Sequence, residues 1–166
     1  MNRFVPNTSR SRAGFTLVEM AMSMAIITII TIGLFDVFVF FLRSYNATTL
    51  MSTAAGRASS GVERMVYGVG TNIGLREAGS TTVSVTYTNG WVLTYTNLTD
   101  SARKSFTYSA DKQMITDWAG KLICTNVVSS TVTDYTTGCQ ITLAVAETGG
   151  GRVITNSVTT FVDFRN

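Results

Sequence analysis

The hydrophobic pattern divides the chain into one long apolar stretch, one amphipathic stretch and a series of short alternating stretches. Residues 15–42 form the apolar stretch, in which Glu19 and Asp36 are the only ionisable side chains. A helix over this range would be about 42 Å long, whereas the hydrocarbon layer of a bilayer is roughly 30 Å thick. We therefore predict a membrane-spanning helix that projects beyond the membrane.

Residues 43–79 are predicted to continue this helix with one apolar face. The apolar residues recur at steps of three and four, which is the helical period. They are Ala47, Leu50, Met51, Ala54, Ala58, Val62, Met65, Val66, Val69 and Ile73. Charged residues such as Arg57 and Glu63 fall on the opposite face. We expect the apolar face to pack on a sheet and the helix to stop at Gly74 or Gly79.

Residues 80–166 are predicted to form an antiparallel sheet, which makes the fold class α+β. Strands are expected near 105–108, 113–117, 121–128, 140–146 and 153–163. Four residues are expected to share the core side of one strand: Cys139, Ile141, Leu143 and Val145. The run Gly149–Gly151 separates the last two strands, as a hairpin connection would.

A further hairpin is predicted around the Asn-Gly step that precedes Trp91. A two-residue turn and a three-residue loop at this step give different registers. The three-residue loop pairs Tyr87 with Trp91 and Val83 with Tyr95, which places the large side chains on one face. We prefer this register, and it requires Gly90 to adopt the left-handed conformation.

The formal charge of +3 is concentrated before the apolar stretch. Arg3, Arg10 and Arg12 lie within residues 1–14, and the ten remaining basic residues are balanced by ten acidic ones. The excess is therefore a topology signal that keeps this end in the cytoplasm, not evidence that the head binds nucleic acid. A secretory signal has its small-residue cleavage site after the apolar core. Here Gly14 precedes the core, so cleavage there would leave the helix on the mature protein.

The two cysteines, Cys124 and Cys139, lie in the C-terminal half of the chain. An even cysteine count beyond a membrane segment favours one structural disulfide in an oxidising compartment. This bond would close a loop of about 16 residues and stabilise the fold by roughly 3 kcal/mol. The alternative is two unrelated free thiols.

The remaining chemistry is sparse. The chain contains no histidine and no clustered carboxylates, so it offers no nucleophile with an oriented base. We predict no catalytic residue, no cofactor and no metal site. Aspartates expected in turns (Asp100, Asp111, Asp117 and Asp134) have a spacing that matches no calcium loop.

The segment GFTLVEM at residues 14–20 resembles the precursors of type IV pilins and type II secretion pseudopilins. Four features carry the resemblance over residues 10–42: a basic leader, Gly14 before the apolar run, Phe15 as its first residue and Glu19 as its fifth. The resemblance implies that a membrane-embedded prepilin peptidase cuts after Gly14 and methylates the new amino group of Phe15. A glycine suits such a site because it adds no side chain to obstruct the backbone.

The same resemblance gives Glu19 a role in subunit assembly, where it would neutralise the terminal amine of a neighbouring subunit. A carboxylate in the middle of a bilayer costs roughly 3 kcal/mol, so an unpaired one is unfavourable. The alternative is a first-turn acid that the helix dipole tolerates on an ordinary anchor. Asp36 stands where many pilins have a proline. It could contact a neighbouring subunit or a platform protein, or it could mark the point where the helix leaves the hydrocarbon.

The resemblance implies a structural subunit, not an enzyme, of a type IV pilus or a type II secretion pseudopilus. Its partners would be other pilin or pseudopilin subunits, the prepilin peptidase, the inner-membrane assembly platform and the membrane itself. The precursor would span the bacterial inner membrane once, with its head in the periplasm, before it enters a filament. The C-terminal part loosely resembles minor subunits, the J-type pseudopilins and W-type minor pilins. Two alternatives remain open: a filament-tip adhesin or DNA-capturing pilin, and a simple membrane-anchored periplasmic domain.

Overall fold

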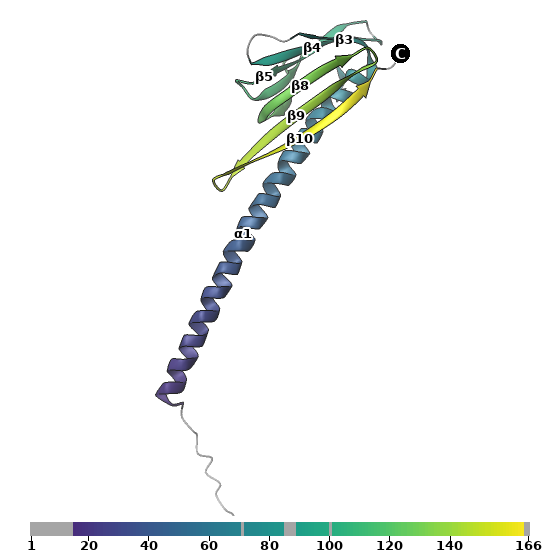
Figure 1. Cartoon of the computed structure of the whole chain (residues 1–166). Coiled ribbons are helices and arrows are strands. Elements are labelled where there is room, and N and C mark those ends of the chain that lie inside the picture. Colours follow the sequence, from purple (N-terminus) through teal and green to yellow (C-terminus); the bar gives the residue numbers. More distant parts are fainter. Residues whose placement is uncertain (1–14, 71, 85–88, 100, 165–166) are drawn as a thin grey trace, which may run out of the picture. The chain divides into compact units, whose positions relative to one another are not determined.

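A computed structural model describes residues 15–70, 72–84, 89–99 and 101–164 of the chain. The chain forms two compact units, Met1–Arg43 and Ser44–Asn166. The long helix α1 (Leu17–Tyr67) contributes to both units, and the strands belong to the second. The predicted α+β class, with a long N-terminal helix packed on antiparallel sheet, is confirmed (Figure 1).

In the first unit, two threonine side chains of α1 are hydrogen-bonded within the helix. The Thr28 hydroxyl donates a hydrogen bond of 2.7 Å to the carbonyl of Met24, and the Thr31 hydroxyl donates one of 2.7 Å to that of Ile27. These bonds to the preceding turn satisfy both threonine donors, which suits a helix in hydrocarbon.

In the second unit, α1 ends earlier than the pattern predicted. The helix stops at Tyr67 and not at Gly74 or Gly79. Gly68 follows it with a φ of 89°, the left-handed conformation that ends many helices. A short hairpin of β1 (Gly68–Val69) and β2 (Asn72–Ile73) comes next, and then the 3-10 turn η1 (Leu75–Glu77).

Two antiparallel sheets complete the second unit. The first has five strands in the order β3-β4-β5-β6-β7, and the second has three in the order β10-β9-β8. Their bounds are β3 (Ala78–Ser84), β4 (Gly90–Asn97), β5 (Arg103–Ser109), β6 (Met114–Asp117), β7 (Leu122–Thr125), β8 (Val127–Tyr135), β9 (Gly138–Gly149) and β10 (Arg152–Asp163). All five predicted strand positions are confirmed, except that 121–128 is divided between β7 and β8. The break falls at Asn126, which has a φ of 58°.

One core joins α1 to both sheets. The buried side chains of the helix are those of Ala54, Ala58, Val62 and Met65, whereas Met51, which was predicted on the same face, is 58% exposed. The sheets contribute residues from β3 to β10, among them the four predicted on one side of β9: Cys139, Ile141, Leu143 and Val145, each fully buried. The predicted alternation along β9 is therefore confirmed.

The register of β3 against β4 differs from the prediction. Val83 pairs with Leu93 and not with Tyr95. The shift is two residues, so the alternation of faces is preserved. Gly90 is the first residue of β4 and has no positive φ. A side chain there would collide with the carbonyl of Tyr108 on β5, which explains the glycine. The predicted partner of Trp91, at position 87, lies outside the described residues.

The predicted disulfide is absent, and both cysteines are buried free thiols. A side chain at Gly61 would touch both Cys124 and Leu143, so these two residues lie close together. Cys139 lies four residues before Leu143 on β9, which corresponds to about 13 Å along the strand. A disulfide needs Cα atoms within about 7 Å of each other. The two cysteines therefore occupy separate positions in the same core.

Candidate assembly site at the start of the helix

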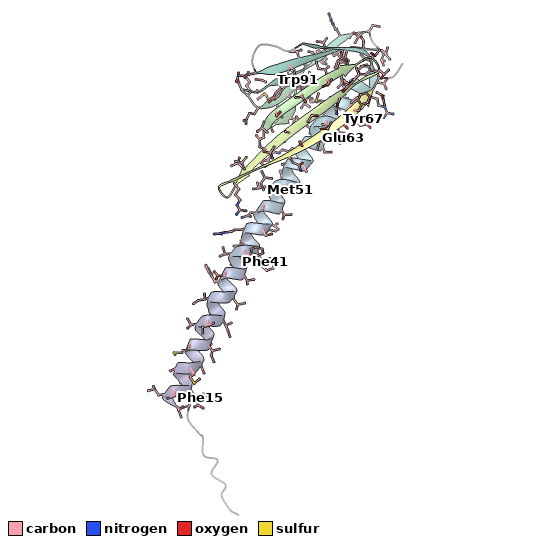
Figure 2. All side chains as sticks on the ribbon, in the orientation of Figure 1. Phe15, Phe41, Met51, Glu63, Tyr67 and Trp91 are labelled. Carbon is pink, nitrogen blue, oxygen red and sulfur yellow. The ribbon has the colours of Figure 1, made fainter. Side chains whose placement is uncertain are left out.

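The candidate site is the start of α1, where the predicted cleavage and assembly residues meet. Gly14 lies outside the described residues. Phe15 is 79% exposed, and the helix begins two residues later at Leu17. The side chain of Phe15 projects away from the helix (Figure 2).

Thr16 and Glu19 form a reciprocal cap on the first turn. The backbone N–H of Thr16 donates to Glu19 Oε2 at 2.8 Å, and the Thr16 hydroxyl donates to the same oxygen at 2.9 Å. In return, the backbone N–H of Glu19 donates to Thr16 Oγ1 at 3.3 Å. This is a capping box, in which a threonine and a glutamate three residues later satisfy each other's free amides.

The cap holds the Glu19 carboxylate at the start of the helix. Glu19 Oε2 is held one peptide away from Phe15, the residue whose amine the predicted cleavage would create. Within the described part of the chain, Oε1 of the same carboxylate accepts no hydrogen bond. The geometry thus leaves one oxygen for a cationic donor beside the start of the helix.

Glu19 was predicted from the sequence as a site residue, whereas Thr16 was not. The missed signal was a standard one, a threonine followed three residues later by glutamate directly before an apolar run. The alternative interpretation of Glu19, a first-turn acid on an ordinary helix, agrees with this local geometry just as well. The cap by itself therefore does not establish an assembly role.

The surface that follows the cap is apolar and uncovered. Side chains from Phe15 to Leu42 project from α1 on all sides, and Figure 2 shows them along the helix. The helix is long and apolar enough to cross a membrane, and its most apolar window has no buried residue within the described structure. Asp36 lies on this exposed part of the helix, and Arg43 follows directly after Leu42.

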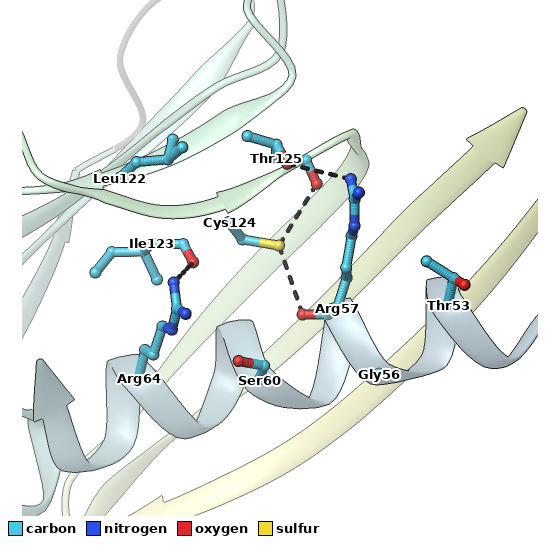
Figure 3. Close-up of a pocket in the computed structure, with 9 residues that line it drawn as sticks. All are labelled: Thr53, Gly56, Arg57, Ser60, Arg64, Leu122, Ile123, Cys124 and Thr125. Atoms are coloured by element: carbon cyan, nitrogen blue, oxygen red, sulfur yellow. Dashed lines mark hydrogen bonds between the residues drawn. The ribbon is translucent and has the colours of Figure 1, made fainter.

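A second polar feature lies in the head, where α1 approaches the edge strand β7. Residues of both elements line a cavity of about 400 Å³, and Figure 3 shows this lining. Arg64 donates to the carbonyl of Ile123 at 3.3 Å, and Arg57 forms an ion pair of 3.0 Å with Glu147 on β9. The Arg57 guanidinium also lies 3.5 Å from the hydroxyl of Thr125. These arginines connect the helix to both sheets and cover the edge of β7.

The cavity contains a thiol but no arrangement for nucleophilic chemistry. Burial raises the pKa of Cys124, so its reactive thiolate form is disfavoured. The Cys124 thiol instead lies 3.7 Å from the carbonyl of Arg57. Among the described residues, no three of the types His, Cys, Asp and Glu gather into a metal-binding group.

Two aspartates expected in turns lie in strands. Asp117 ends β6, and its Oδ1 accepts the backbone N–H groups of Ala119 and Lys121 at 3.0 and 2.7 Å. Asp134 lies on β8, where it accepts a hydrogen bond from the hydroxyl of Thr81. Asp117 therefore shapes the turn that follows it, and Asp134 connects the two sheets.

Comparison with known proteins bears on the N-terminal segment. Residues 9–35 match the family of the prokaryotic N-terminal methylation motif. No curated protein and no solved structure matches the chain. The match supports a type IV pilin-like precursor and a subunit of pilin or pseudopilin type. Such subunits are structural, not enzymatic. They are processed by prepilin peptidase and assemble with other subunits, and their apolar helix anchors them in the membrane.

Proposed function

We propose that this chain is a minor structural subunit of a type IV pilus or a type II secretion pseudopilus. It is processed after Gly14, methylated on Phe15 and assembled through its N-terminal helix. The observation that carries the proposal is the capped Glu19 at the start of an uncovered apolar helix, within the segment that matches the methylation motif. The likeness of the C-terminal part to J-type pseudopilins and W-type minor pilins supports the minor status.

The uncovered helix requires two successive environments. Apolar surface is unstable in water, so the helix between Phe15 and Leu42 has to lie in lipid before assembly and against other helices afterwards. The basic residues of the leader favour a cytoplasmic N-terminus and a periplasmic head. The inner-membrane platform would then receive the subunit from the lipid.

Glu19 supplies specificity to this packing. In hydrocarbon an unpaired carboxylate is penalised by up to roughly 3 kcal/mol, less near the interface. The cap satisfies Oε2 within the chain, while Oε1 can accept the terminal amine of a neighbouring subunit. A charged hydrogen bond of this kind would favour one arrangement of subunits over others.

The first test is mass spectrometry of the mature N-terminus from cells that carry the matching secretion or pilus genes. We expect the first residue to be N-methylated Phe15. An intact leader would contradict the proposal and would leave a membrane-anchored domain.

The second test separates processing from assembly. Glu19→Ala should be cleaved like the wild type but fail to enter filaments, because the carboxylate partner of the amine is lost. Thr16→Val is the matched control, since it removes the hydroxyl of the cap and leaves the carboxylate. We expect this control to assemble. Normal filament entry of Glu19→Ala would refute the assembly role.

A further inference from the structure

Three ionisable residues occur between Phe15 and Arg43, and only one of them has a partner in the described structure. Glu19 is held by Thr16, whereas Asp36 and Arg43 have no ion pair in the first unit. Both lie on α1, seven residues apart. An acid and a base of opposite charge thus remain on an apolar helix without a counter-ion among the described residues of their own chain.

Helix geometry explains why they do not pair with each other. Seven residues are two turns, so Asp36 and Arg43 are separated by about 10.5 Å along the axis but only about 20° around it. Phe40 occupies the turn between them and is 68% exposed. The two charges therefore lie on one stripe of the helix, at different heights.

We infer that Asp36 forms an ion pair with Arg43 of a second copy of this chain, displaced by two helical turns toward its N-terminus. This inference rests on the proposed function, because it requires neighbouring helices in a filament. The charges are complementary. A parallel copy displaced by about 10.5 Å places its Arg43 level with Asp36. An undisplaced copy would instead place like charges side by side, which is unfavourable.

The same displacement is consistent with the assembly role of Glu19. It brings Glu19 of the displaced copy to a level about 4.5 Å along the axis beyond Phe15 of the first copy, on the side where the amine created by cleavage would lie. A glutamate side chain can bridge such an axial offset, and its Oε1 is open. One displacement thus brings both carboxylates of the helix close to cations of a neighbouring subunit.

Cysteine cross-linking in membranes of assembling cells tests the displacement. Two tagged copies of the full chain would carry Asp36→Cys and Arg43→Cys, respectively. The native thiols are buried and are expected to stay unreacted. We expect oxidation to give the mixed 36–43 dimer in several-fold excess over the 36–36 and 43–43 dimers. The matched control pairs Asp36→Cys with Phe40→Cys, one turn short, and should cross-link less.

Charge exchange supplies an independent measurement. Asp36→Arg and Arg43→Asp should each reduce filament entry by roughly fivefold, as expected for a partly desolvated pair, and the double variant should recover most of it. Equal yields of all cross-linked dimers, or no recovery in the double variant, would overturn the inference. A loss confined to Arg43 variants without the mixed dimer would assign Arg43 to lipid phosphate, and the inference would again be wrong.

These outcomes differ from a failure of the proposed function. If Glu19→Ala enters filaments normally or Phe15 is not methylated, the proposed function fails whatever the cross-links show. If both behave as expected and the mixed dimer is absent, only the pairing of Asp36 with Arg43 fails.

Discussion

Gly61 is the point of closest approach between α1 and the sheets, and replacing it tests how the head is packed. A β-carbon at this position would lie 2.9 Å from Leu143 Cδ2 and 3.0 Å from Cys124 Cβ. The leucine methyl can move, but Cys124 Cβ is fixed by the backbone of β7. Overpacking of this kind costs roughly 1–3 kcal/mol.

The net effect of Gly61→Ala also contains a favourable contribution from helix propensity. Alanine in a helix interior is favoured over glycine by about 1 kcal/mol. The variant should therefore be destabilised by an amount from about zero to 2 kcal/mol, which is the packing cost reduced by the propensity gain.

Gly56 on the same helix provides the matched control. Nothing lies within 4 Å of a β-carbon built there, so Gly56→Ala should gain about 1 kcal/mol from propensity alone. The difference between the two variants isolates the packing cost of roughly 1–3 kcal/mol. For a domain of this size that corresponds to a difference of about 4–12 °C in melting temperature.

The assay is thermal unfolding of the full chain in detergent, followed by near-ultraviolet circular dichroism. Buried aromatic residues such as Trp91 make this signal specific to the packed head. If Gly61→Ala melts at or above the temperature of Gly56→Ala, the close approach does not exist and the packing described for the head is wrong.

The remaining predictions concern the ion pair and the thiols of the head. Arg57→Met should lower the melting temperature more than Glu147→Gln, because it leaves a buried carboxylate with only the 3.4 Å contact of Asn126; equal effects would contradict this. Without reductant, Cys124 and Cys139 should react with a thiol reagent only after unfolding, and a disulfide detected by mass spectrometry would refute the fold around them. Burial raises the pKa of Cys139 from 9.0 to about 12, so the unfolded chain ionises first as the pH rises. Stability should therefore be intact below about pH 9 and fall toward pH 12, and Cys139→Ala should flatten that fall.

Local patterns predicted the parts of this fold that depend on local physics. The apolar period of α1 and the alternation of β9 follow from side chains that must be buried on one face, so both were recoverable from the sequence. The end of the helix was not, because Gly68 and Gly74 are equally good stops in the sequence. Gly68 is the one that adopts the left-handed conformation.

Long-range pairings were the harder part. The alternating pattern did not fix the register of Val83 against Leu93, because a shift of two residues preserves the alternation of faces. The disulfide prediction was wrong for a similar reason. Spacing shows that Cys124 and Cys139 could close a loop, but only the three-dimensional arrangement shows that Cys124 packs beside Leu143, away from Cys139. Neither the register of the strands nor the separation of the two cysteines can be predicted from a local sequence pattern.

At the candidate site, the sequence identified the residue but not its local partner. Glu19 stands out because a carboxylate in an apolar run is rare and costly. Thr16 does not, because a threonine in such a run is ordinary. Its role follows only from its position three residues before Glu19. In the structure, the backbone N–H and the hydroxyl of Thr16 both donate hydrogen bonds to one carboxylate oxygen of Glu19.

Both parts of α1 carry apolar side chains that have to be covered from water, but the chain's own sheets cover only one part. Apolar side chains near Ala58 are covered by sheets of the same chain, whereas those from Phe15 to Leu42 have no cover within the described structure. Lipid and neighbouring helices can both cover an apolar side chain. They differ in the counter-ions that they provide for Glu19 and Asp36. Hydrocarbon provides none, whereas a neighbouring helix of the same kind would provide two, its terminal amine and its Arg43. If the pairings proposed above form, the two acids make association favourable at one axial displacement, and the membrane anchor then also serves as a filament contact with a defined register.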